Sequence, residues 1–203
     1  MFPLALLNAA SPPSPPVVYN TVLWLKFEGA DGSTIIDSTG RHTPSLSESG
    51  TRAILNNQLN LASHGFIRAD AQSTASSDFD FSSSDFEIEC KVTYTAWAFV
   101  WMHTADDNGF GMCLIFNGAD TIQVRSALDQ TIMGYTAPTS FAGRQAKINV
   151  SRTGTNYSLK VDDIEVDTAS GVFAIGSNGF IIGAYPASSG MTGLIDDFIV
   201  KRF

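Results

Sequence analysis

The chain has 203 residues, of which 44% are hydrophobic and 16% are charged, a composition that suits one packed domain and argues against a disordered chain. Its net charge is -8, with 12 lysines plus arginines and no basic run, so we expect neither nucleic acid nor an anionic membrane as a partner. No apolar run reaches the roughly 18 residues that a membrane-spanning helix needs.

The first 20 residues hold five of the eight prolines, a density that favours an extended, polyproline-like path. We expect residues 1–20 to form an N-terminal arm and residues 21–203 to form a single domain. The apolar tip of the arm would be poorly placed in water, so we expect it to dock on another subunit. The alternative is a floppy linker. The tip side chains are Phe2, Leu4, Leu6 and Leu7.

From Val22 onward, short runs of alternating apolar and polar residues recur between turn clusters, and no segment keeps the apolar spacing of an amphipathic helix. So many strands in one domain predict an all-β fold of two antiparallel sheets packed face to face, a β-sandwich or jelly roll. The predicted strands are 22–27, 54–60, 65–69, 86–94, 98–104, 111–116, 121–125, 146–152, 158–161, 164–168, 179–183 and 193–200.

The stretch LWLKFEGADGSTIIDSTGR, residues 23–41, is a strand that breaks into an acidic, glycine-punctuated loop. Asp31 and Asp37 bring carboxylates to this loop, and calcium prefers several oxygen ligands gathered from loops of this kind. The alternative is that both aspartates only cap turns by accepting hydrogen bonds from backbone amides. Both interpretations stay open at the level of the sequence.

Four segments in the right order resemble laminin-G-like jelly-roll domains of the concanavalin-A-like lectin and glucanase superfamily. They are LWLKFEGADGSTIIDSTGR, FIRADAQSTASSDFDFSSSDFEIECKV, AKINVSRTGTNYSLKVDDIEVDTA and GFIIGAYPASSGMTGLIDDFIVKRF. The chain departs from the family pattern at two points. Lys147 replaces an aromatic residue or histidine, and Val161-Asp162-Asp163 replaces a Val-Asp-Gly turn, which leaves the geometry of that hairpin open.

Asp196 and Asp197 interrupt the apolar final strand, so one of them must face inward or lie at an edge. A buried carboxylate needs a cation, backbone amides or a base. The resemblance implies that the last strand runs beside the first, which would bring Asp196 near the acidic loop. We therefore expect a structural calcium ion shared by Asp31, Asp37 and Asp196, with a salt bridge from Asp196 to Lys26 or Arg41 as the alternative.

The sequence shows no motif of catalytic residues. Retaining glycosidases on the concanavalin-A-like scaffold need two carboxylates about 5–5.5 Å apart, usually from a Glu-x-Asp-x-Glu strand, and no such triplet occurs. Glu87 and Glu89 share the outward face of their strand and are expected to be solvated. The histidines at 42, 64 and 103 lack metal-ligand spacing. We assign no catalytic residue and predict that the chain is not an enzyme.

Exposed aromatic rings beside hydrogen-bonding residues are the signature of sugar binding, because rings stack on the apolar faces of sugars. Tyr94, Trp97 and Trp101 are close in sequence, but their spacing suits alternating core positions equally well. We favour the core for these rings and assign no carbohydrate-binding residue.

Domains of the resembled type are common in bacteriophage virion proteins, as one jelly roll with an added arm. The resemblance implies a non-enzymatic virion protein, made in the host cytoplasm, that decorates or cements a capsid through its arm. Its expected partners are the major capsid protein and its own copies, and structural calcium is the one cofactor expected. The alternative is a carbohydrate-binding module for host attachment, a tail or surface adhesin that takes surface glycans.

Overall fold

The computed structural model describes residues 20–29, 34–46, 51–62, 67–69, 77–96, 98–104, 110–127, 130–173, 175, 178–185 and 189–203. The predicted docking tip at Phe2, Leu4, Leu6 and Leu7 therefore lies outside the described residues, as do Asp31 and Trp97.

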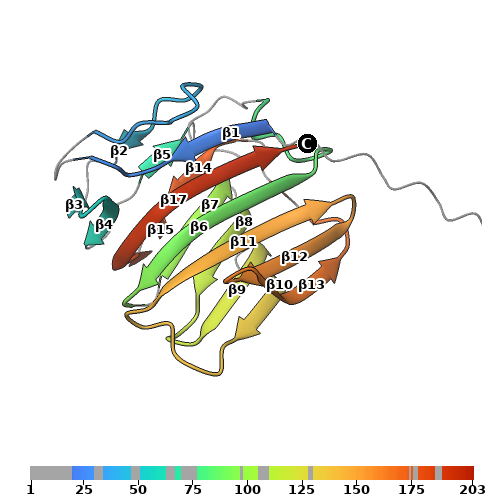
Figure 1. The fold of residues 1–203 in the computed structure, drawn as a ribbon. Coiled ribbons are helices and arrows are strands. Elements are labelled where there is room, and N and C mark those ends of the chain that lie inside the picture. The colour runs from blue at the N-terminus through green and yellow to red at the C-terminus, as the bar shows by residue number, and fades with distance from the viewer. Residues whose placement is uncertain are drawn as a thin grey trace, which may run out of the picture.

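The first of two antiparallel sheets, which we call sheet A, has the strand order β13-β12-β11-β6-β17-β4-β3, with β1 also paired to β17. It faces the viewer in Figure 1. Its strands are β1 (Asn20–Leu25), β3 (Thr51–Leu55), β4 (Gln58–Ala62), β6 (Phe86–Tyr94), β11 (Gln145–Thr153), β12 (Asn156–Val161), β13 (Ile164–Ser170) and β17 (Gly193–Arg202).

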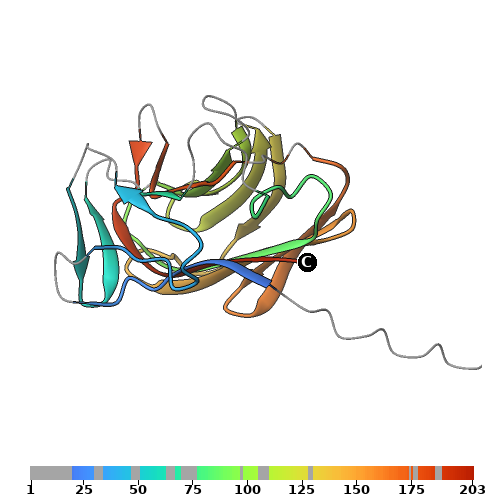
Figure 2. The ribbon, with the colours of Figure 1, turned by 90° about the horizontal axis from the view of Figure 1, so that it is seen from above.

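The second sheet, sheet B, has the order β10-β9-β8-β7-β14-β5-β2 and lies behind sheet A as a second layer (Figure 2). Its strands are β2 (Ser45–Leu46), β5 (Ile67–Ala69), β7 (Ala98–Thr104), β8 (Phe110–Phe116), β9 (Thr121–Ala127), β10 (Gln130–Thr136) and β14 (Phe180–Ile182), and a separate pair is formed by β15 (Ala184–Tyr185) and β16 (Ser189–Gly190). Within the described ranges the structure contains no helix, and so none able to cross a membrane. The predicted all-β sandwich is confirmed.

The core lies between the two sheets and is rich in aromatic rings. Side chains that alternate between the two faces of a strand place the core between the sheets. In β6, every second side chain from Phe86 to Tyr94 is buried and the others are partly exposed. Trp101 is fully buried and Tyr94 is 4% exposed, so the prediction that these two rings belong to the core is confirmed. The largest fully buried side chains are Trp101, Tyr157, Phe79, Phe81, Phe86, Phe116, Phe141, Phe180 and Phe198.

The prediction of one strand over residues 54–60 is wrong, because a hairpin occupies this stretch. Asn56 and Asn57 have φ angles of 51° and 59°, as a two-residue type I′ turn requires. The same turn joins β12 to β13, where Asp162 and Asp163 have φ angles of 51° and 67°. Asp tolerates the left-handed region better than most residues, so the hairpin keeps its geometry without the glycine of the family pattern.

The strands that the sequence analysis missed are β2, β10, β15 and β16, of which three have only two residues. The longer one, β10, lies at the edge of sheet B. Met133 is the one buried side chain in this strand. An edge strand with so little burial lacks the apolar alternation on which the prediction depended.

Candidate functional site

The pairing of β17 changes partner in the middle of the strand. On one side β17 pairs with β4 up to Ile195 and with β1 from Phe198 onward. Between these two residues lie Asp196 and Asp197, which have no ladder partner on this side among the described residues. We call this break in the pairing, between β1 and β4, the notch. Figure 1 shows β1 and the β3–β4 hairpin beside different parts of β17.

The backbone at the notch adopts sparsely populated conformations. Asp197 has a φ of 48°, and Phe27, which follows β1, has a φ of 57°. Positive φ is rare for a bulky residue and costs on the order of 1–3 kcal/mol unless the surroundings enforce it. Such residues cluster at functional sites, which draws attention to the groups around them.

A β-bulge at Asp197 corrects the prediction for the acidic pair. The register with β6 shifts between Asp196 and Ile199, and an extra residue in a bulge resets the alternation of the strand. Both carboxylates therefore project outward, with side chains 23% and 27% exposed, and Phe198 returns to the core. Neither acid faces inward. The pair lies where β17 has no ladder partner on one side among the described residues, which corresponds to the edge position that the sequence analysis gave as the other possibility.

Lys91 on β6 is the base that contacts this acidic pair. Its ammonium donates to Asp197 Oδ2 and lies 3.9 Å from Asp196 Oδ2. Burial raises the pKa of Asp196, the charge of Asp197 and that of Glu28 raise it further, and Lys91 opposes them. The pKa of Lys91 is raised as well, chiefly by its hydrogen bond to Asp197. The base that meets Asp196 is thus Lys91, and not the predicted Lys26 or Arg41.

Trp24 places an indole ring beside these charges. The ring is partly exposed on the outer face of sheet A, and its Nε1–H donates to Asp197 Oδ1 over 3.4 Å. The ammonium of Lys26 lies 4.2 Å from the ring centroid, a cation–π contact. We define the notch site as Trp24, Lys26, Glu28, Lys91, Asp196 and Asp197.

The sequence analysis did not single out Trp24 for binding. Its alternation with Leu23 and Leu25 was the available signal, because a tryptophan on the outward face of a strand is unusual for a solvated position. The sequence contains no comparable signal for Lys91, because the acids that it contacts, Asp196 and Asp197, lie far along the chain.

Asp37, one of the predicted calcium ligands, is a turn-capping residue. It is 3% exposed, and its carboxylate accepts hydrogen bonds from the amides of Trp24, Thr39, Arg41 and His42 at 3.0–3.1 Å and from the Thr39 hydroxyl at 2.5 Å. Burial raises its pKa, but these hydrogen bonds outweigh burial and hold the pKa below its ordinary value. For Asp37, the capping interpretation is confirmed.

The calcium site itself stays a prediction, since Asp31 lies outside the described residues. The part of the chain that the structure describes holds no group of three His, Cys, Asp or Glu side chains arranged for a metal ion. At Asp37 a cation would have to compete with five hydrogen-bond donors. Arg41, the other predicted partner of Asp196, donates instead to Asp78 Oδ2 at 2.7 Å.

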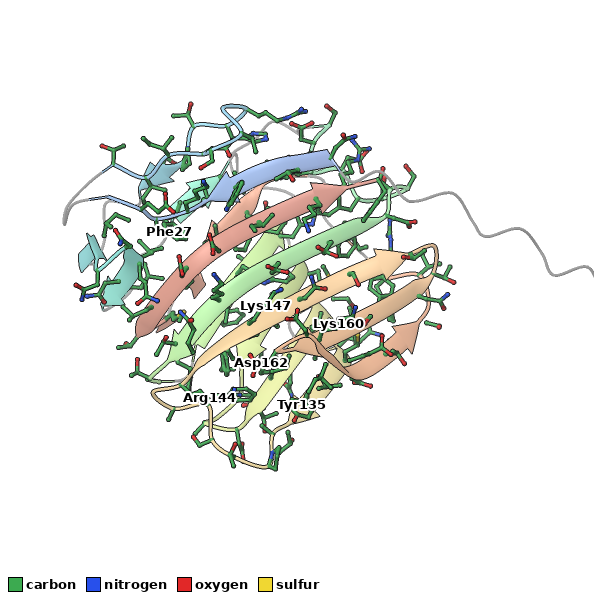
Figure 3. The ribbon with its side chains drawn as sticks, viewed as in Figure 1. Phe27, Tyr135, Arg144, Lys147, Lys160 and Asp162 are labelled. Atoms are coloured by element: carbon green, nitrogen blue, oxygen red, sulfur yellow. The ribbon has the colours of Figure 1, made fainter. Side chains whose placement is uncertain are left out.

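The outer face of sheet A away from the notch is a ladder of ion pairs. Glu87 contacts Lys201 at 2.6 Å and Glu89 contacts Lys147 at 3.2 Å, and Lys147 also reaches Asp163 at 2.8 Å. Figure 3 shows Lys147 on this face. Glu87 and Glu89 share the outward face of β6, as predicted, but each is paired with a lysine and the two side chains are 19% and 18% exposed.

No family model matches the chain, and no curated protein matches it. Solved structures match through their fold. Domain 4 of AbnA, an extracellular arabinanase from Geobacillus stearothermophilus, in complex with arabinotriose, has a TM-score of 0.66 and 16% identity over 90% of this chain and 92% of that chain.

Two larger proteins match over part of their length. The Trypanosoma rangeli sialidase in complex with the inhibitor DANA has a TM-score of 0.68 and 12% identity over 89% of this chain and 30% of its own. A structure concerning cell entry of botulinum neurotoxin type C and its interaction with two ganglioside molecules has a TM-score of 0.63 and 14% identity over 89% of this chain and 47% of its own. At these identities the likeness shows the β-sandwich fold alone.

Proposed function

We propose that this domain is a non-catalytic carbohydrate-binding module that holds glycans at the notch site. The observation that carries the proposal is the partly exposed indole of Trp24 beside the outward carboxylates of Asp196 and Asp197. An aromatic face next to hydrogen-bonding groups is what a sugar ring needs, because its C–H face stacks and its hydroxyls bond at the rim.

Each group of the notch site has a role in this proposal. The indole ring of Trp24 takes the apolar face of a sugar. The carboxylates of Asp196 and Asp197 accept hydrogen bonds from sugar hydroxyls, and Lys91 donates. Because the indole N–H is already held by Asp197, the ring is oriented before the ligand arrives, which reduces the entropy lost on binding.

Lys26 covers the ring in the free protein and must move aside. An exposed cation–π contact contributes only about 0.5–1 kcal/mol. Stacking between two aromatic rings contributes about 0.5–1.5 kcal/mol beyond the area it buries, and we expect a gain of similar size for the C–H face of a sugar on the indole. A sugar therefore outcompetes the lysine, but by a small margin, so we expect a single sugar unit to bind weakly.

The comparisons support this proposal without deciding it. The arabinanase domain was solved with arabinotriose, and the neurotoxin structure concerns ganglioside molecules. Two structural neighbours with glycans in their descriptions favour the carbohydrate-binding interpretation over the virion interpretation. Capsid decoration through Phe2, Leu4, Leu6 and Leu7, with location in the virion, stays a prediction, because those residues lie outside the described ranges.

The test is binding of neutral oligosaccharides to the full chain, first on a glycan array and then by calorimetry with the best ligand. Trp24→Ala is expected to weaken binding at least tenfold, and Trp24→Phe, which keeps a ring, should retain part of it. Thermal melting checks that both variants are folded. Equal affinity of the wild type and the alanine variant would remove the notch site from the proposal.

A further inference from the structure

The ring of Trp24 already carries a cation in the free protein. The ammonium of Lys26 lies 4.2 Å from the ring centroid, and among the described residues no ion pair includes Lys26. An indole face attracts positive charge because the ring has a quadrupole with a negative face. The outward face of Trp24 is therefore a place where the cation of a ligand can replace that of Lys26.

Acids outnumber bases around this ring. The notch site holds the carboxylates of Glu28, Asp196 and Asp197 and the ammonium groups of Lys26 and Lys91. It thus has one more negative than positive charge. When Lys26 moves aside for a ligand, Lys91 alone faces the three acids, and the excess of negative charge grows. A ligand that brings a positive charge restores the balance, whereas a neutral ligand does not.

Asp196 is the carboxylate with the weakest compensation. Burial raises its pKa, the charges of Asp197 and Glu28 raise it further, and Lys91 opposes them. The ammonium of Lys91 donates to Asp197 Oδ2 and lies 3.9 Å from Asp196 Oδ2. Among the described residues, no side chain donates a hydrogen bond to Asp196. Its carboxylate, 23% exposed, can therefore accept from an ammonium that a ligand supplies.

The acids lie at the rim of the ring, where the substituents of a stacked sugar would reach them. The indole Nε1–H of Trp24 donates to Asp197 Oδ1 over 3.4 Å, and Asp196 precedes Asp197 in the strand. On the other side, Phe27 is buried and is labelled in Figure 3, while its neighbours Lys26 and Glu28 are partly exposed and exposed. Charged groups thus surround the ring from two strands, and most of them are acidic.

We propose that the sugar unit preferred by the notch site is an amino sugar with a free, protonated amine. The inference rests on the proposed function, because stacking of the sugar on Trp24 is what brings the amine to the acids. The ammonium of the sugar donates to Asp196 and takes over the charge that Lys26 supplies in the free protein. An N-acetylated sugar lacks this charge, and an acidic sugar adds to the negative excess.

The experiment is an NMR titration of the full chain with glucosamine hydrochloride, compared with glucose and N-acetylglucosamine at matched ionic strength. At about pH 6 an aliphatic amine of this kind is protonated. We expect glucosamine to bind at least fivefold more tightly than either neutral sugar and to shift the indole N–H signal of Trp24. Glucosamine should also lower the pKa of Asp196 in a carboxyl titration, whereas glucose should leave it unchanged.

The variants compare the ratio of the glucosamine affinity to the glucose affinity. Asp196→Asn should bring this ratio down to about one, because the acceptor charge is lost. Lys26→Met should raise the ratio, since this lysine repels the ligand ammonium as well as covering the ring. The control is Glu165→Gln, which removes an exposed acid from β13 on the same sheet, outside the notch site, and should leave the ratio within twofold of the wild type.

Three outcomes would overturn the inference. N-acetylglucosamine that binds as tightly as glucosamine would show that the site does not select the charge. Free lysine that binds as tightly as glucosamine would make the notch a general ammonium site without a preference for a sugar. A ratio that stays high in Asp196→Asn would place the amine at another group.

Trp24→Ala separates this inference from the proposed function. If neutral oligosaccharides bind through Trp24 and glucosamine has no advantage over glucose, only the inference on the amine fails. If glucosamine is selected through Asp196 while neutral oligosaccharides bind equally well to the wild type and to Trp24→Ala, the stacking on Trp24 fails and the selection of positive charge stands.

Discussion

Two aspartates near the junction of β1 and β17 show how different environments give one residue type different roles. Asp37 lies among converging amides and has a lowered pKa. Asp196 lies beside a like charge and has a raised pKa. Trp24 links the two regions, because its backbone amide donates to Asp37 and its indole donates to Asp197.

The donors around a carboxylate, and not the acidic residue itself, decide whether the carboxylate is structural. At Asp37 five donors of the protein itself contact the carboxylate, and any ligand would have to compete with them. At Asp196 and Asp197 one lysine serves two acids over a strained backbone, which leaves acceptor capacity facing solvent.

The largest effect is expected for Asp37→Asn. The substitution removes the charge that four amides and a hydroxyl share and turns an amide group toward donors. We expect a loss of about 3 kcal/mol in the free energy of unfolding, measured with urea. The matched control is Asp163→Asn in an exposed ion pair, which should lose less than about 1 kcal/mol. Equal losses would show that Asp37 does not hold its turn.

The two aspartates should affect the pH dependence of stability in opposite directions. Asp37 has a lower pKa in the folded than in the unfolded chain, so its stabilisation is present above about pH 4 and disappears as pH falls through the folded value. Asp196 has a higher pKa in the folded than in the unfolded chain. Its contribution to stability is therefore present below about pH 4 and declines as pH rises through the folded value. Urea denaturation across pH 2–7 gives the free energy of unfolding of the wild type, Asp37→Asn and Asp196→Asn. The difference between the wild type and each variant should change with pH in opposite directions for the two sites, and changes in the same direction would contradict the assignment.

A smaller effect is expected for Asp197→Asn. Asparagine tolerates the left-handed backbone, and its carbonyl can still accept the indole N–H of Trp24. The negative charge beside Asp196 disappears and Lys91 becomes free to pair with it, so the pKa of Asp196 should fall. Carboxyl NMR titration measures this change, and Lys91→Met should move the pKa upward. A pKa of Asp196 that stays fixed in both variants would show that the three groups are not coupled.

The smallest effect is expected for Lys26→Met. The substitution removes the ammonium from the ring of Trp24 and keeps an apolar stem. Loss of a competing contact of about 0.5–1 kcal/mol should raise the affinity for a neutral oligosaccharide two- to fivefold. Lys147→Met serves as the control for net charge, and calorimetry would detect the difference. Weaker binding of the Lys26 variant would mean that the lysine contacts the ligand.

The sequence allowed much of the fold to be predicted, because alternation is a local signal. The predicted bounds of β6 and β7 agree with those observed. β6 carries one regular buried face, whereas β7 is buried at every residue from Phe99 to Thr104. The notch could not be predicted in this way. A bulge such as that at Asp197 adds one residue to a strand and leaves no mark in composition, so the outward direction of Asp196 and its pairing with Lys91 became visible only in three dimensions.

The position of β17 has a consequence for biosynthesis. This strand follows all others in sequence, yet it lies inside sheet A, with β6 on one side and β1 and β4 on the other. While the ribosome is still making it, the strands on its two sides lack their common neighbour and sheet A stays in two parts. The domain is therefore expected to complete its fold only after translation of this last strand, and chaperones that cover exposed strand edges would act on it until then.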